Sequence, residues 1–424
     1  PDTAATTFTV TRGVHRSAFE ERWKLVYDGA AHRSTALRAW DRVNERWMFT
    51  WVSDDGLFQV WEGRKFGDDW YIVREFEVDG ERFLSRQAWI PRGRDELVRV
   101  MERSFDGGRS WETRSRTRFR RVSGPAAGAR AVALTFDDLP LAGGSDPDLA
   151  TARRVTDALL AALERRRAPA VGFVNEQKLE RDGRVVSARV ELLRRWASAG
   201  HELGNHGYSH EDLHATPLDE FQADVLRGAQ VTRRVMAEVG RAPSWFRHPY
   251  LHTGRDIETR TAFERFLAEH GYRVAPVTVD NYDYLFAAAY RRLEAAADPA
   301  AGRVVEEYLR YMERVVAYYE QQSRALLGRE IPQVLLLHAN ALNAVALDPL
   351  LDMLERRGYE FITLERALRD PAFDLPDTYT GAGGITWLHR WALTMGKRGD
   401  FFAGEPEVPE WVARAAEGGE GGGS

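Results

Sequence analysis

The stretch 131–138, AVALTFDD, is a short apolar run that ends in two carboxylates. A helical pattern follows over 148–167, and a second apolar run, AVGFVN, occupies 170–175. Short apolar strands that alternate with amphipathic helices recur beyond this point, and they predict an α/β domain with a parallel sheet or (β/α) barrel. Because such barrels carry their reactive side chains at the C-terminal ends of strands, the residues after each strand are the functional candidates.

The first 120 residues have a different rhythm. Eight of the 13 tryptophans lie between Trp23 and Trp111, in short alternating runs such as WMFTWVS at 47–53. Turn pairs such as Asp79-Gly80 separate these runs, which is typical of an antiparallel meander or barrel. The aromatic rings serve either as a core, in a structural or docking module, or as a surface that stacks on sugars.

These patterns divide the chain into three parts. We predict an aromatic-rich antiparallel β-barrel-like accessory domain over 1–125 and a (β/α) barrel domain with a C-terminal extension over 126–415. The small-residue stretch 123–130, SGPAAGAR, is the predicted linker. The Gly-rich end, 416–424, is expected to be a flexible tail.

Charge and cysteine content exclude several classes of protein. The 59 basic and 64 acidic residues give a net charge of −5, which offers no reason to expect a nucleic acid partner. There is no cysteine, so any metal must be held by His, Asp or Glu. No apolar run is long enough for a membrane-spanning helix. The chain begins at Pro1, which indicates a removed export signal or a trimmed chain, and we expect a secreted or periplasmic protein.

Polar residues gather at five predicted strand ends. They are Thr135–Asp138, His206 to His210, Arg247–Tyr250, Asp280–Tyr284 and His338. The first, second and fifth have ordinary structural explanations when taken alone: an Asp pair in a turn, an accidental pair of surface histidines, and a histidine satisfied in the core. Five such clusters in one consistent order are hard to explain as separate accidents.

Three of these residues suit a divalent metal ion. His206 and His210 are four residues apart and lie on one face if the segment is helical, and Asp138 supplies a third ligand. Two histidines and one carboxylate leave open positions on the ion, which is typical of a catalytic rather than a structural site. The neighbouring Asp137 points in a different direction and is available as a base.

From Ala131 to about Asp370 the chain resembles the polysaccharide deacetylases with a NodB-type domain, the carbohydrate esterases of chitin and peptidoglycan. The matching motifs are TFDD at Thr135–Asp138, His-x3-His at His206 and His210, Arg-x-Pro-Tyr at Arg247–Tyr250, Asp-Trp at Asp283-Tyr284 and Leu-x-His at Leu336–His338. The resemblance implies a distorted (β/α) barrel in a bacterial, cell-wall-active protein. It also implies Zn²⁺ or a similar divalent ion held by Asp138, His206 and His210.

The same resemblance implies a role for each further motif residue. Asp137 is implied as the general base, and the backbone N–H of Tyr250 as a donor to the oxyanion. His338 is implied as the acid that protonates the departing amine. Arg247 is implied to orient Asp137, and Asp283 to hold His338 in its protonated form.

Some segments depart from the family pattern. Tyr284 stands where Trp is common, and His248 stands where Phe or Tyr is common, so the pocket wall and the third-motif loop are expected to differ in polarity. The insertion 286–328 is strongly helical, and its Tyr and Val stripe predicts core packing. The segment 378–393, TYTGAGGITWLHRWAL, is expected to pack against the barrel.

Three functions fit these patterns. The first is removal of acetyl groups, N-acetyl before O-acetyl, from a glycan or oligosaccharide. The second is hydrolysis of a non-peptide C–N bond in a small molecule, and the third is glycan binding without catalysis. A binding protein has no use for Asp137 beside Asp138, so the sequence favours a hydrolase.

Overall fold

The computed structural model describes residues 7–12, 18–27, 30–54, 56–66, 69–92, 96–120 and 130–417. The chain divides into two compact units, Pro1–Ser123 and Gly124–Ser424. Most of the predicted linker at 123–130, the proposed domain boundary at 125/126 and most of the predicted tail lie outside the described residues.

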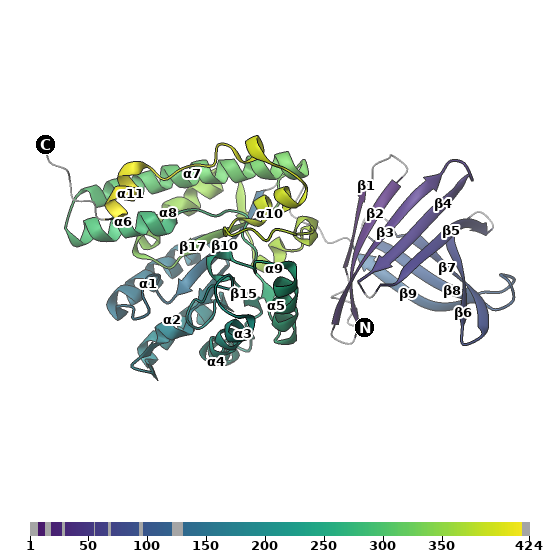
Figure 1. Ribbon diagram of the computed structural model, residues 1–424, viewed down its shortest axis with the longest axis horizontal. Helices are drawn as coiled ribbons and strands as arrows, with labels where there is room; N and C mark the ends of the chain where they lie inside the picture. Colours follow the sequence, from purple (N-terminus) through teal and green to yellow (C-terminus); the bar gives the residue numbers. More distant parts are fainter. Residues whose placement is uncertain are drawn as a thin grey trace. The chain divides into compact units, whose positions relative to one another are not determined.

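The N-terminal unit is one antiparallel sheet in which nine strands pair in sequence order (Figure 1). The strands are β1 (Thr7–Arg12), β2 (Ala18–Tyr27), β3 (Ala30–Asp41), β4 (Arg46–Ser53), β5 (Phe58–Phe66), β6 (Asp69–Val78), β7 (Glu81–Pro91), β8 (Glu96–Ser104) and β9 (Glu112–Arg120). The sheet is curled, so that strands far apart in its order come close together. The ring of Trp23 on β2 lies 5.6 Å from that of Trp89 on β7 and 5.8 Å from that of Phe119 on β9. Trp23 and Trp61 are buried core residues. The predicted antiparallel, barrel-like architecture is confirmed.

The larger unit has a parallel sheet with the hydrogen-bonded order β16-β15-β14-β11-β10-β17, and β18 also pairs with β10. The strands are β10 (Arg130–Leu139), β11 (Ala170–Val174), β14 (Glu202–Asn205), β15 (Trp245–Phe246), β16 (Arg273–Val274), β17 (Gln333–His338) and β18 (Tyr359–Phe361), with a separate hairpin of β12 (Glu180–Arg181) and β13 (Arg184–Val185). All five residues of β11 are buried, as expected for a parallel strand that is covered on both faces.

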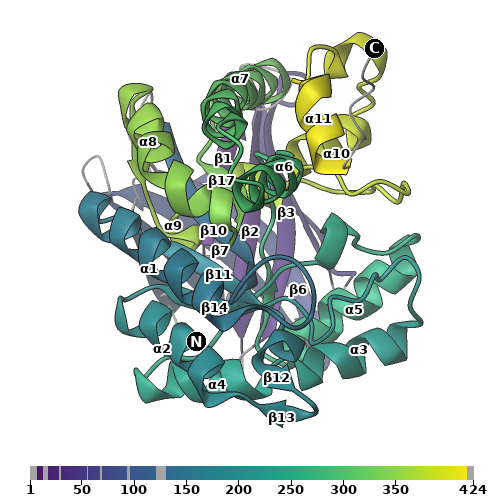
Figure 2. The ribbon, with the colours of Figure 1, turned by 90° about the vertical axis from the view of Figure 1, so that its left-hand side faces the viewer.

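Helices surround this sheet (Figure 2). They are α1 (Leu149–Arg166), α2 (Ser187–Ser198), α3 (Leu218–Arg227), α4 (Gln230–Glu238), α5 (Ile257–Glu269), α6 (Asp283–Ala295), α7 (Ala300–Leu327), α8 (Ala341–Arg356), α9 (Leu364–Ala367), α10 (Trp387–Thr394) and α11 (Glu410–Glu417). The predicted insertion helix is α7, and its buried stripe, which includes Tyr308, Tyr311 and Val315, confirms core packing.

The segment after β16 links the two edges of the sheet. The Ala275 N–H donates to the carbonyl of Phe246 on β15, and Val279 forms an isolated parallel bridge with Leu335 on β17. The regular strands form a half-barrel, and this segment joins its edges into a distorted ring. The (β/α) barrel prediction is therefore confirmed.

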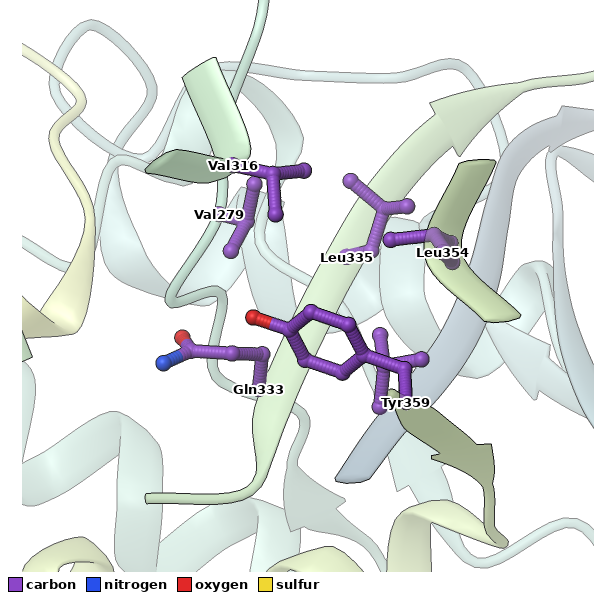
Figure 3. A pocket seen from close by; sticks show the side chains of 7 residues that line it. Val279, Val316, Gln333, Leu335, Leu354 and Tyr359 are labelled. Atoms are coloured by element: carbon purple, nitrogen blue, oxygen red, sulfur yellow. The ribbon is translucent and has the colours of Figure 1, made fainter. Parts of the chain in front are cut away.

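Close packing fills the space between the sheet and the helices. Val279, Leu335 and Val316 lie here with the polar Gln333 and Tyr359 (Figure 3). The space that these side chains enclose is too small to hold a water molecule. This region is core, so the candidate site must be sought at the strand ends.

The C-terminal extension packs against the barrel, as predicted. The Trp387 N–H donates to the Val277 carbonyl at 2.7 Å. Arg390 is buried and bonds Thr253 on the third-motif loop and Asp377 in the extension itself. Within the part of the chain that the structure describes, no helix is long and apolar enough to cross a membrane.

Removing the N-terminal unit is expected to leave the larger unit folded. Each unit has its own hydrophobic core, and units of this kind fold independently. A chain that starts at Gly124 should unfold cooperatively, at the temperature of the corresponding transition of the full chain, when followed by circular dichroism. Loss of that cooperative transition would show that the N-terminal unit is integral to the fold.

Candidate active site

The polar clusters predicted from the sequence meet at one edge of the parallel sheet. Asp138 lies near the end of β10, His206 directly follows β14, Arg247 follows β15, and His338 is the last residue of β17. Asp137 and His338 are direct partners in the pairing of β10 with β17. Because these strands are parallel, their C-terminal ends bring side chains from distant parts of the chain together.

Asp138, His206 and His210 form a compact group. Each offers one ligand atom, and these atoms all lie within 4.8 Å of one another. The helical turn considered for the two histidines is wrong, because residues 206–210 form a tight loop. In this loop Gly207 has φ 75° and His210 has φ 64°. The ring centroids of His206 and His210 lie 4.8 Å apart.

Helix α3 and the residue that follows it hold this loop in place. Asp224 accepts hydrogen bonds from the backbone N–H groups of Tyr208, at 2.8 Å, and Ser209, at 3.1 Å. Gly228 lies against the loop so closely that a Cβ there would be 2.6 Å from the carbonyl carbon of Gly207. The sequence gives no signal for Asp224, because an Asp on an amphipathic helix looks like an ordinary surface residue.

The protonation states of the group suit a divalent cation. His206 Nδ1 lies 2.8 Å from the Arg247 carbonyl, so this nitrogen carries the proton and Nε2 has a lone pair. Burial lowers the pKa of His206 and of His210 to about 4, which keeps both rings neutral at pH 7. Neutral imidazole and ionised carboxylate are the forms that bind a metal, so the residues present fit such an ion.

Lys178 is a buried cation beside this group that the sequence analysis did not identify. Its Nζ lies 3.1 Å from Asp138 Oδ1, and only 6% of the residue is exposed. Burial opposes ionisation of Asp138, but the charge of Lys178, followed by that of His338, holds the pKa of Asp138 well below its ordinary value. A metal ion bound here would share Asp138 with this ammonium, and repulsion between the two cations would weaken its binding.

Asp137 has surroundings unlike those of its neighbour. Its Oδ2 lies 3.8 Å from His206 Nε2, and its Oδ1 lies 3.9 Å from Nε of the fully buried Arg247. Burial raises the pKa of Asp137, although the charge of Arg247 acts in the opposite direction. Arg247 is itself positioned by a 2.9 Å hydrogen bond from Nη2 to Thr135 Oγ1. A buried carboxylate with a raised pKa is a stronger base than an exposed one.

His338 and Asp283 form a close pair. The His338 Nδ1 lies 2.6 Å from Asp283 Oδ1, and the His338 backbone N–H donates to Asp283 Oδ2 at 2.8 Å. Asn343 Nδ2 also donates to Asp283 Oδ2, at 2.6 Å, and so fixes the carboxylate. Burial opposes the charged ring, but the charge and hydrogen bond of Asp283 outweigh it and raise the pKa of His338 to about 10.

Three exposed tyrosines lie near the histidines of the candidate site. Tyr250, Tyr282 and Tyr284 are 57%, 45% and 51% exposed, and the Tyr284 ring lies 6.5 Å from that of His338. His248 has a different environment, since it is buried against Phe246 and Phe263. The departure at Tyr284 therefore faces solvent, while the departure at His248 lies in the interior.

A polar cavity of about 80 Å³ adjoins the fourth-motif loop. Its lining includes Asp280, Tyr311 and Tyr319, together with His389 and Glu405 of the C-terminal extension. Burial raises the pKa of Asp280 to about 6. The two fourth-motif aspartates thus have separate surroundings, because Asp283 contacts His338 while Asp280 lines this cavity.

Comparison with known proteins identifies the part of the chain that carries the first three motifs. Residues 124–275 match the family model described as polysaccharide deacetylase. This stretch is therefore similar to the polysaccharide deacetylases. The matched range contains Asp137, Asp138, His206, His210 and Arg247. The Asp283–His338 pair lies beyond it, so its assignment depends on the geometry above.

The chain is similar to curated proteins. The chain is 27% identical over 197 residues to the peptidoglycan-N-acetylglucosamine deacetylase of Bacillus cereus, covering 46% of this chain and 60% of that protein. It is 31% identical over 151 residues to the chitooligosaccharide deacetylase of Bradyrhizobium sp., covering 36% of this chain and 60% of that protein. The chain thus spans about 60% of the length of these relatives.

The chain was also compared with solved structures. The crystal structure of a polysaccharide deacetylase from Bacillus cereus matches with 21% identity and a TM-score of 0.39, over 55% of this chain and 92% of that one.

Proposed function

We propose that the larger unit is a metal-dependent hydrolase that removes acetyl groups, chiefly N-acetyl, from a carbohydrate. The observation that carries this proposal is the convergence of three metal-ligating atoms within 4.8 Å beside a second buried carboxylate and an Asp–His pair. The names of relatives that act on peptidoglycan and chitooligosaccharides support an N-acetylglucosamine polymer as the substrate. Such a polymer would place the protein outside the cytoplasm.

Asp138, His206 and His210 would hold the ion, with Zn²⁺ as the proposed species because nitrogen and carboxylate donors suit it. When bound, the ion supplies Lewis acidity, which polarises the acetyl carbonyl and acidifies a water molecule. Asp138 is ionised and lies next to the ammonium group of Lys178. The two histidines present neutral rings to the ion at pH 7.

Asp137 takes the proton from the attacking water. Its raised pKa favours proton uptake, and Arg247 orients the carboxylate from 3.9 Å. The backbone N–H of Tyr250 donates to the carbonyl oxygen as negative charge develops on it. Tyr250 has φ 56°, which turns this peptide out of a regular helical path.

His338 delivers a proton to the departing amine. Asp283 holds Nδ1, so Nε2 is the nitrogen that donates. A pKa of about 10 keeps the ring protonated at neutral pH, so that it has a proton to donate to the departing amine. The exposed rings of Tyr282 and Tyr284 offer apolar faces on which a sugar can stack.

Product analysis tests this proposal. The protein, loaded with Zn²⁺, is incubated with N-acetylated chitin oligomers, with peptidoglycan and with small cyclic amides or ureides. Acetate from the glycans, abolished by a chelator, is the expected result. Ammonia or carbamate from the small amides without acetate would instead establish an amidohydrolase, and glycan binding without either product would establish a binding protein.

A further inference from the structure

A second group of metal-ligating side chains lies beside the candidate active site. Asp212, His214 and His252 each offer one ligand atom, and these atoms all lie within 4.8 Å of one another. Asp212 and His214 follow the second motif, and His252 follows the third motif. None of the catalytic steps proposed above uses these three residues.

The geometry of this group leaves histidine nitrogens available to a ligand. The rings of His214 and His252 stack with centroids 4.0 Å apart and planes 6° apart. His252 Nδ1 lies 2.7 Å from Asp212 Oδ1, which fixes the proton on this nitrogen and leaves a lone pair on Nε2. Both ring nitrogens of His214 are buried from solvent. The backbone of Ala382 is near this ring, but neither nitrogen makes a hydrogen bond of ordinary length and angle.

We propose that Asp212, His214 and His252 bind a second divalent metal ion of the Zn²⁺ class. Two imidazoles and one carboxylate are the same donor set as at Asp138, His206 and His210, and they suit the same ions. Rotation about the side-chain bonds tilts the two rings out of their stack and directs one nitrogen of each toward the ion. A ring nitrogen of His214 then becomes a ligand of the ion.

An ion at this position would join two loops that the proposed catalysis depends on. His214 belongs to the loop that begins at the second motif, and His252 follows Tyr250 and Leu251, which both have φ 56°. Residues other than glycine rarely adopt this left-handed backbone conformation, so contacts with the surrounding structure must keep the loop in it. The Tyr250 ring lies between the two groups, 4.6 Å from His210 and 5.8 Å from His252.

The C-terminal extension covers the same loop. Gly384 lies against the Tyr250 carbonyl, where any Cβ would collide with it. The second ion therefore has a positioning role, since it fixes the loop that presents the Tyr250 N–H. This catalytic consequence rests on the proposed function, whereas binding of the ion does not.

Metal counting tests the inference. The purified full chain is dialysed against Zn²⁺ at a fixed free concentration and its metal content is measured, together with the visible absorption of the Co²⁺ form. We expect about two ions per chain in the wild type, because each group supplies three ligands, and about one in His252→Gln and in Asp212→Asn. His270→Gln, which changes a histidine outside both groups, is the control and should keep both ions.

The same measurement tests the two metal sites separately, because each single variant removes ligands from only one of them. His206→Ala is expected to retain one ion, bound by the second group, and the double variant His206→Ala with His252→Gln is expected to retain none. If His252→Gln and Asp212→Asn bind as many ions as the wild type, the second site is wrong and the first is unaffected. If His206→Ala loses nothing while His252→Gln loses one ion, the second site stands and the metal centre of the proposed function is wrong.

Discussion

Replacing Asp137 with Asn is expected to leave metal content almost unchanged and to lower turnover by roughly 10²-fold to 10⁴-fold, the usual contribution of a positioned general base. The amide cannot accept the proton of the attacking water, but it keeps the shape of the side chain. Substrate affinity should change little, since the lost interaction develops mainly in the transition state. Steady-state kinetics of acetate release measure both quantities.

Asp138→Asn is the matched variant and should fail in a different way. The neutral amide is a poorer ligand, and it leaves the charge of Lys178, 3.1 Å from Asp138 Oδ1, without its carboxylate partner. Both effects weaken metal binding, so ion and activity should be lost together. If Asp137→Asn loses the ion while Asp138→Asn keeps it, the two roles are reversed, and full activity in both variants would rule out the assigned site.

Replacing His338 with Ala should spare the metal and lower hydrolysis of acetamido sugars by roughly 10²-fold to 10⁴-fold, because the amine departs only when protonated. Activated aryl acetates should lose much less, since their leaving groups need no proton. Comparison of the two substrates on one preparation measures the effect. An equal loss on both would show that His338 does not act as the acid.

Replacing Asp283 with Asn is expected to change the pH dependence of kcat. The ordinary pKa of histidine is 6.5, and Asp283 is the main cause of the rise to about 10. Without the carboxylate, burial lowers the pKa of His338, so the ring loses its proton as pH rises through a lower value. The alkaline limb of kcat should therefore shift from about pH 10 toward neutral pH. An unshifted limb in this variant would contradict the Asp283–His338 assignment.

Much of the fold of the larger unit could be predicted from the sequence. Buried runs such as AVGFV are strands because every residue is apolar, and the parallel arrangement then places the following polar residues at one edge. The pattern of strands therefore predicts the positions of Asp137, Asp138, His206 and His338 without any distance. The fold of the histidine loop could not be found in this way, because a spacing of four fits both a helical turn and a tight loop.

Other parts of the site gave weak signals or none. Lys178 stands in the charged run EQKLE, where a lysine looks solvated, and only the fold shows that it is buried against Asp138. His214 continues the spacing of His206 and His210 by four residues, which was an available signal for the second group. His252 had no such signal, because its contact with Asp212 joins residues 40 positions apart.

Metal add-back is the most direct test of the central proposal that the larger unit is a metal-dependent deacetylase. Chelated protein is titrated with Zn²⁺ while acetate release from an N-acetylated oligosaccharide is measured, for the wild type and for His206→Ala in parallel. We predict that acetate release by the wild type is absent without the ion and returns as the ion is added, whereas His206→Ala stays inactive at the same Zn²⁺ concentrations. Acetate release by chelated wild type at its full rate, or equal restoration of His206→Ala, would contradict the account.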